Sequence, residues 1–108
     1  MAGPRMTTSV LKVVAALLVD PALERYGLEL MQDTRLPSGT LYPILVRLER
    51  AGWVQSRWED ADPVAEGRPN RRYYRLTTEG TVAARAEVAL MHAQMSRAAA
   101  PPRRTSQA

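Results

Sequence analysis

The fold of this chain depends most on one stretch: Leu36-Pro-Ser-Gly-Thr-Leu-Tyr-Pro-Ile-Leu-Val-Arg-Leu-Glu-Arg-Ala-Gly52. Its apolar residues recur at helical spacing and would share one buried face: Leu41, Ile44, Leu45 and Leu48. Hydroxyl and guanidinium groups point elsewhere, on Ser38, Thr40, Tyr42, Arg47 and Arg50. Such groups hydrogen-bond to phosphates and to base edges. The pattern predicts either a DNA recognition helix or an ordinary amphipathic helix with a solvated polar side.

A proline lies inside this stretch and bears on where the helix begins. In a helix interior, Pro43 would remove a hydrogen bond and cost roughly 3 kcal/mol. We therefore expect Thr40 to be the N-cap and Ser38-Gly39 to be the entering turn, so that Pro43 falls in the first turn. The free N–H groups at such a helix start would suit a phosphate.

The flanking sequence favours the recognition helix. A shorter helical stretch, Tyr26 to Thr34, precedes it and is separated from it by Arg35-Leu36-Pro37, a connection of helix-turn-helix length. Ala51-Gly52 should end the recognition helix. A first helix is expected from an N-cap at Thr7 or Thr8 up to Asp20-Pro21, with its apolar residues at helical spacing: Val10, Leu11, Val14, Leu17 and Leu18.

Two later segments predict a β-ribbon with a wing. Trp53 to Glu59 and Arg71 to Leu76 are rich in aromatic residues and alternate with polar ones, as antiparallel strands do. The loop between them is rich in Asp, Pro and Gly, with acids at its beginning and arginines at its end. We expect phosphate or minor-groove contacts from Arg68, Arg71 and Arg72. The alternative is a solvated hairpin with balanced charge.

Composition limits the possible functions. The chain has 108 residues, a formal net charge of +4 and a pI near 10.1, which favours a polyanionic partner: DNA, RNA or an anionic membrane surface. It has no cysteine, so it forms no disulfide or thiolate metal site, and one histidine, His92, has no ligand set around it. The longest apolar run, Val13 to Val19, is too short to span a bilayer. We expect a soluble cytoplasmic protein without membrane partner, metal or cofactor.

The segment from Thr78 to about Arg97 predicts a long helix with two apolar stripes, and a small domain needs only one of them for its own core. A second subunit is the simplest partner for the other. Residues expected in the dimer interior, either as plain core or around a small-molecule effector, are Val14, Leu18, Val88, Met91 and Met95. The expected organisation is a disordered arm (1–6), a winged helix-turn-helix (7–77), a dimerisation helix (78–97) and a disordered tail (98–108).

Three segments resemble the PadR-like transcriptional regulators, in the short subgroup with a single C-terminal helix. They are Tyr26-Gly-Leu-Glu-Leu30, Leu36 to Trp53, and Gly67-Arg-Pro-Asn-Arg-Arg-Tyr-Tyr-Arg-Leu-Thr-Thr-Glu-Gly80. The resemblance covers most of the chain from Val10 to about Met95 and implies a mainly α fold with a small β-ribbon: a winged helix-turn-helix plus a dimerisation helix. It also implies a homodimeric repressor released by a small molecule.

The resemblance implies residue roles as well. The residues facing the major groove or its phosphates would be Ser38, Thr40, Tyr42 and Arg47, and those serving the wing would be Arg68, Arg71 and Arg72.

Two classes of function remain to be compared. The first is a dimeric, sequence-specific DNA-binding repressor that reads a pseudo-palindromic operator with half-sites one helical turn apart. The second is a winged-helix protein-interaction module, which would be expected to expose an apolar or acidic patch where this chain has hydroxyls and arginines. An enzyme is not expected, because no nucleophile, base and acid can be assembled and no phosphate-binding glycine loop follows a strand.

Overall fold

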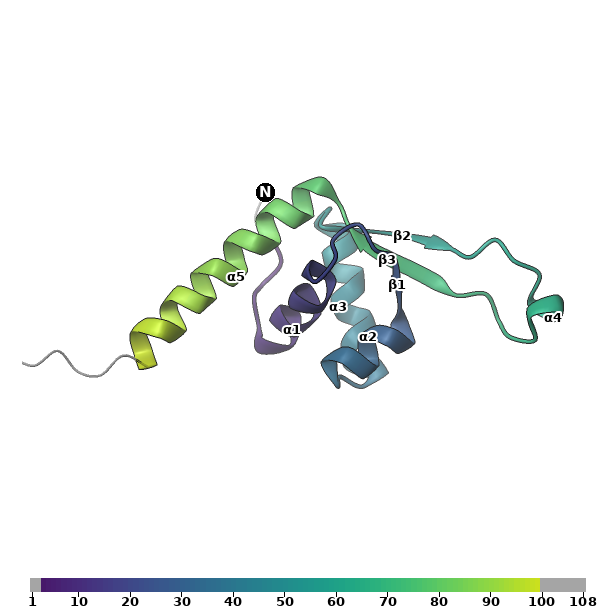
Figure 1. Ribbon diagram of the computed structural model, residues 1–108, viewed down its shortest axis with the longest axis horizontal. Helices are drawn as coiled ribbons and strands as arrows, with labels where there is room; N and C mark the ends of the chain where they lie inside the picture. Colours follow the sequence, from purple (N-terminus) through teal and green to yellow (C-terminus); the bar gives the residue numbers. More distant parts are fainter. Residues whose placement is uncertain (1–2, 100–108) are drawn as a thin grey trace, which may run out of the picture.

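The computed structural model describes residues 3–99, which form a mainly helical fold with a small antiparallel sheet (Figure 1). In chain order the elements are α1 (Thr8–Leu18), β1 (Arg25–Tyr26), α2 (Gly27–Thr34), α3 (Ser38–Arg50), β2 (Val54–Trp58), α4 (Pro63–Glu66), β3 (Arg72–Leu76) and α5 (Thr78–Ala99). The predicted fold class, helices with a winged ribbon and a long final helix, is confirmed. No helix among residues 3–99 has the length and apolarity needed to cross a bilayer.

The first helix begins at a hydroxyl cap and supplies much of the core. The side chain of Thr7 accepts a hydrogen bond from the Val10 N–H at 3.2 Å, which satisfies one of the free donors at the helix start. The buried side of α1 consists of Val10, Val13, Val14 and Leu17. Before the helix, Met6 packs against the same core, and Gly3 lies against the indole of Trp53. Residues 3–6 thus follow the surface of the domain.

Helices α2 and α3 form the expected helix-turn-helix. α2 ends at Arg35, whose left-handed backbone (φ 60°) directs its N–H to the Met31 carbonyl at 2.8 Å. The Thr34 hydroxyl donates to the Leu30 carbonyl at 2.6 Å and accepts from the Leu36 N–H at 3.3 Å, so the turn is fixed from within. α3 then buries the four apolar residues predicted from their spacing: Leu41, Ile44, Leu45 and Leu48.

The predicted N-cap of the recognition helix, Thr40, is wrong by three residues. α3 begins at Ser38 with extended Pro37 as its N-cap, and the Pro37 carbonyl accepts from the N–H groups of both Thr40 and Leu41 at 3.0 Å. Pro43 is therefore the sixth residue of α3, inside the helix, and cannot donate to the Gly39 carbonyl. The burial of four large side chains along α3 outweighs this lost bond.

The sheet has one strand that the sequence did not predict. Among residues 3–99 the strand order is β1-β3-β2, all antiparallel, and β2 pairs with β3 in the register Val54↔Leu76 to Trp58↔Arg72. The added strand is β1, whose Tyr26 pairs with Tyr73 on β3. Tyr26 was expected to open the second helix; instead it is the N-cap of α2, and its N–H donates to the Glu29 carboxylate at 3.2 Å. Two residues are too few for a periodicity, so the β3 edge alone creates this strand.

The loop after β2 contains a further unpredicted element. The Asp62 side chain caps α4 by accepting from the Val64 N–H at 3.0 Å, and Gly67, with φ 69°, ends this single turn. Figure 1 shows β2 and β3 extending away from the helices, with α4 at the far end of the connection. This projecting hairpin, residues 54–76, is the wing.

The last helix begins against the peptide group of Trp53. The Trp53 carbonyl accepts from the Thr77 N–H at 2.9 Å, and Gly80 lies so close that a Cβ there would be 2.0 Å from the same oxygen. Ala84 is fully buried where α5 runs beside α1 (Figure 1). α5 continues to Ala99, two residues beyond its expected end, because alanines 98 and 99 favour helix. The rest of the expected tail lies outside the described residues.

Candidate nucleic-acid interface

The exposed side of α3 carries most of the polar residues assigned to it from the sequence. Ser38, Tyr42 and Arg47 are exposed, whereas Thr40 is half-buried. The Arg47 Nε donates to the Pro43 carbonyl at 3.3 Å, which holds the start of its side chain along the helix. Val46, one turn after Tyr42, is an exposed apolar residue that the sequence analysis did not single out. A surface of this kind offers hydroxyl and guanidinium donors together with a contact for a thymine methyl group.

Tyr42 is held in place by the helix before it. A Cβ built on Gly27, the first residue of α2, would lie 2.0 Å from the Tyr42 hydroxyl oxygen and 2.7 Å from its Cζ. The tyrosine ring therefore rests on a glycine that leaves room for it. Because this contact joins the starts of α2 and α3, it fixes the direction of the Tyr42 side chain relative to the helix-turn-helix.

A groove of about 720 Å³ separates the starts of α2 and α3 from the wing. It is lined by aromatic rings, guanidinium groups and a few other side chains: Tyr26, Gly27, Leu28, Tyr42, Trp58, Arg68, Pro69, Asn70, Arg71, Arg72 and Tyr74. Burial raises the pKa of the Tyr74 phenol above its usual range, so this ring stays neutral at the base of the groove. The groove brings Tyr42 together with the three predicted wing arginines, whereas Ser38, Thr40 and Arg47 do not line it.

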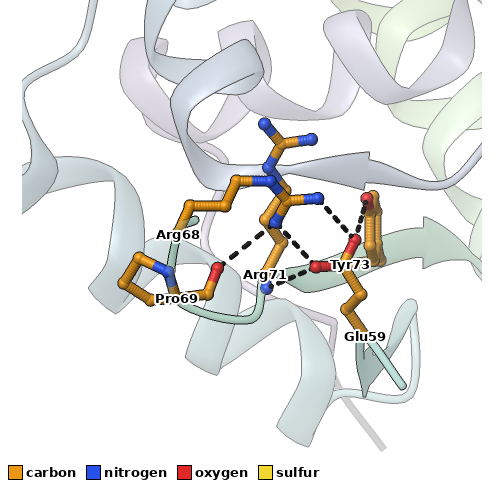
Figure 2. A network of polar contacts seen from close by, with 5 residues as sticks. All are labelled: Glu59, Arg68, Pro69, Arg71 and Tyr73. Carbon is orange, nitrogen blue, oxygen red and sulfur yellow. Dashed lines mark hydrogen bonds and ion pairs between the residues drawn. The ribbon is translucent and has the colours of Figure 1, made fainter. Parts of the chain in front are cut away.

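The end of the wing is organised around a carboxylate, Glu59 (Figure 2). Its two oxygens accept from the Nη1 and Nη2 of Arg68 at 2.7 and 3.0 Å, a bidentate pair. It also accepts from the Tyr73 hydroxyl at 3.2 Å and the Arg71 N–H at 3.4 Å. The Arg68 hydrogen bonds, helped by those from Arg71 and Tyr73, lower the pKa of Glu59 to about 2. The carboxylate is therefore ionised at neutral pH.

The other two wing arginines also have partners within the chain. The Arg71 guanidinium lies over the ring of Tyr26, 4.2 Å from its centroid. Arg72 donates to the Ser56 Oγ at 2.8 Å, and its guanidinium lies over the Trp58 ring at 5.2 Å. Aromatic stacking leaves the edge of a guanidinium able to donate, whereas the bidentate pair occupies the fork of Arg68. Arg68 therefore has less capacity for a phosphate than the sequence suggested.

Glu59 and Trp58 are site residues for which no role is predicted from the sequence. A signal for Glu59 was present: it follows β2 directly, and extending the strand register by one pair places it opposite Arg71. The Glu59 N–H indeed donates to the Arg71 carbonyl at 2.7 Å. The contact with Arg68 depends on the turn around Gly67, and no periodicity in the sequence reports that turn.

The residues expected in a dimer interior differ in how far they reach the surface. Val14 is fully buried in the core of its own protomer, so it has no surface to offer a partner or an effector. Leu18, Val88 and Met91 are half-buried, and Met95 is exposed. Two further apolar side chains on α5, Val82 (67%) and Leu90 (52%), are exposed, and they lie on the second apolar stripe of this helix. Within residues 3–99 no three acidic, histidine or cysteine side chains gather as they would around a metal ion.

A short helix-turn-helix followed by a two-stranded wing defines the winged helix-turn-helix class of DNA-binding domains. The sequence model of the PadR-like family of transcriptional regulators matches residues 17–86, and the chain belongs to this family. It is accordingly a DNA-binding transcriptional regulator. Among curated proteins, no sequence matches the chain.

Solved structures with the same fold include members of this family. The smu.1704 protein of Streptococcus mutans is 25% identical, with a TM-score of 0.67 over 89% of this chain and 88% of its own. A PadR family transcription regulator of Clostridium difficile is 24% identical, with a TM-score of 0.61 over 84% of this chain and 97% of its own. AbfR, solved in an overoxidized form bound to DNA, is 25% identical, with a TM-score of 0.61 over 84% of this chain and 59% of its own.

Proposed function

We propose that the protein is a sequence-specific repressor that places α3 in the major groove of its operator. The observation that carries this proposal is the exposed side of α3, where Ser38, Tyr42 and Arg47 lie beside an anchored helix-turn-helix and Val46 adds an apolar contact. Because the Tyr42 ring rests on Gly27, its direction is fixed before DNA binds. Tyr42 is therefore assigned to reading one base edge and not to accepting any base. Thr40, which is half-buried, is assigned a phosphate contact at the helix start.

The wing supplies contacts that position the protein without reading sequence. Arg71 and Arg72 line the groove beside Tyr42. The guanidinium of Arg71, stacked on Tyr26, is assigned a phosphate contact. Arg72 donates to Ser56 and lies 3.7 Å from the Glu49 carboxylate, and it is assigned a phosphate contact through its remaining N–H groups. Arg68 lines the same groove, but its fork is occupied by Glu59. AbfR, which is similar over 84% of this chain and was solved bound to DNA, supports DNA as the ligand of the protein.

We infer that the protein acts as a homodimer built through α5 and reads a pseudo-palindromic operator. The supporting observation is the exposed stripe of α5, which includes Val82 and Leu90 and is not covered by any of residues 3–99. Two symmetry-related α3 helices would enter successive major grooves, roughly 34 Å apart. A small molecule that binds beside the half-buried Leu18, Val88 and Met91 and alters the packing of α5 would release the operator.

The proposal is tested by selecting duplexes from a random-sequence pool with the purified protein. Anisotropy titrations with the selected duplex and a scrambled duplex, each at several salt concentrations, then give affinity, sequence ratio and salt slope. We expect an inverted repeat and a preference of at least about a thousandfold for the selected duplex. A protein-interaction module would enrich no sequence and would bind both duplexes equally and weakly, which would overturn the proposal.

Two variants separate reading from positioning. Tyr42→Ala is expected to lose about 1–3 kcal/mol of discrimination at one position of each half-site, with little change on scrambled DNA. Arg71→Gln is expected to weaken both duplexes alike and to reduce the salt slope by about 1. Equal losses on both duplexes for Tyr42→Ala would remove the assigned role of this residue in reading sequence.

A further inference from the structure

The residue that organises the wing is an acid, although it lies at the edge of a surface proposed to attract phosphates. Glu59 has a side chain only 16% exposed and binds Arg68, whose side chain is 30% exposed, through both carboxylate oxygens. The Tyr73 hydroxyl and the Arg71 N–H approach the same carboxylate (Figure 2). Four donor contacts from three residues therefore converge on one group.

The guanidinium of Arg68 is bound by the Glu59 carboxylate and is not left to solvent. A guanidinium binds a carboxylate and a phosphate through the same fork of N–H groups, so the two anions compete for it. The carboxylate is already present and is held by Tyr73 and the Arg71 backbone, whereas a phosphate arrives only with the DNA. Arg68 thus lines the groove with the Nη1–Nη2 edge of its guanidinium bound to Glu59, and the carboxylate compensates its charge there.

We propose that Glu59 is a positioning residue that limits how strongly the wing attracts DNA of any sequence, because it keeps Arg68 out of the set of phosphate contacts. The inference rests on the proposed DNA binding by this surface. Sequence-independent affinity rises with the number of phosphates neutralised, and its logarithm changes by about 0.9 per contact for each tenfold change in salt. When the wing makes one phosphate contact fewer, a larger share of the binding free energy comes from α3, which discriminates between DNA sequences.

The first experiment compares the wild-type protein with Glu59→Gln on a scrambled duplex between 50 and 200 mM salt, on the order of the range in which such contacts are resolved. Glutamine keeps the size of the side chain. Its one oxygen can accept from the Arg71 N–H in place of Oε1, and its NH2 group can donate to the Tyr73 hydroxyl, but it lacks the charge that holds Arg68. We expect the salt slope to steepen by about 0.9 and binding at 0.1 M salt to tighten by roughly five- to tenfold. An unchanged or shallower slope would overturn the proposal.

Three further variants isolate the cause. The double variant Glu59→Gln/Arg68→Gln is expected to return to the wild-type slope, because the released guanidinium is gone. Glu79→Gln makes the same charge change at an exposed position on α5 and should steepen the slope by much less. Arg68→Gln alone is expected to leave the slope unchanged; a decrease of about 0.9 would show that Arg68 already contacts a phosphate and would overturn the proposal even if Glu59→Gln fails to fold.

The outcomes also separate this inference from the proposed function. Selection of an operator by the wild-type protein supports the proposed function whatever the slopes of these variants are. If the salt slope is unchanged in Glu59→Gln and lower in Arg68→Gln, only the proposed role of Glu59 is overturned. Failure of the wild-type protein to bind either duplex would overturn both proposals.

Discussion

Gly80→Ala should destabilise the fold although it replaces a helical glycine. In an exposed helix interior this change stabilises a protein by roughly 0.5–1 kcal/mol, because alanine loses less backbone entropy on folding. Here the added Cβ would lie 2.0 Å from the Trp53 carbonyl oxygen and 2.6 Å from its carbonyl carbon. Both neighbours belong to the backbone, so no flexible side chain can move away.

The expected magnitude follows from what must move. Relief of the overlap requires α5 to shift from the Trp53 peptide, and overpacking of this kind costs about 1–3 kcal/mol. The shift also strains the hydrogen bond from the Thr77 N–H to the Trp53 carbonyl, now 2.9 Å long, which contributes about 1 kcal/mol. After the helix-propensity gain is subtracted, a net loss of about 2 kcal/mol remains. For a domain of this size that corresponds to a fall of roughly 8–16 °C in Tm.

Thermal and urea unfolding, followed by circular dichroism at a fixed protein concentration, measure this loss. The matched control is Gly39→Ala on α3, where no atom lies within 4 Å of an added Cβ, so the same substitution should raise stability by up to about 1 kcal/mol. If Gly80→Ala were as stable as the wild-type protein or more so, the argument that this glycine permits the docking of α5 would be refuted.

Three other results are expected. Leu90→Glu should give a monomer in light scattering and weaken operator binding, while each subunit keeps its salt slope. Arg97→Gln, near the end of α5, makes the same change of −1 in charge and serves as the control, which should remain a dimer. Gly27→Ala should displace the Tyr42 ring and lower the preference for the selected duplex several-fold in anisotropy titrations, while unfolding stability changes by less than for Gly80→Ala. The pKa of Glu59 is lowered from 4.5 to about 2 in the folded protein, so its stabilising contribution is complete above pH 4.5 and is lost as the pH falls toward 2. Urea unfolding at several pH values across that range should therefore show that the free energy of unfolding falls more steeply for the wild-type protein than for Glu59→Gln. Parallel dependences of this free energy on pH would contradict the stabilising role of the Glu59 carboxylate.

The main elements of the fold were predictable because their signals are local. The buried face of α3 follows from apolar residues spaced at three and four positions, and the hydroxyl of Thr7 marks the start of α1. Strand β1 was not predictable, because Arg25 and Tyr26 become extended only by pairing with β3. The predicted start of α3 was wrong because burial of the apolar face of α3 outweighs the hydrogen bond that Pro43 cannot form.

The candidate site was predictable by residue type and less so by arrangement. The hydroxyls and arginines of α3 and the wing could be named from the sequence, and the structure places Tyr42 and three wing arginines around one groove. Which arginine is already paired depends on the turn at Gly67 and on the strand register, both of which are tertiary features. Val14 was misassigned for a similar reason: spacing alone does not say which side of an apolar helix belongs to its own core.

The proline within α3 changes what the recognition face can accept as well as what it can donate. Because Pro43 has no N–H, the carbonyl of Gly39 lacks the donor that a helix ordinarily supplies four residues later, and both residues are exposed. The amino groups of adenine and cytosine in the major groove are donors that need such an acceptor. This acceptor is a backbone oxygen, so no exchange of another side chain on the exposed face removes it. Only a substitution of Pro43 that restores an N–H at residue 43 would return this oxygen to the hydrogen bonds of the helix.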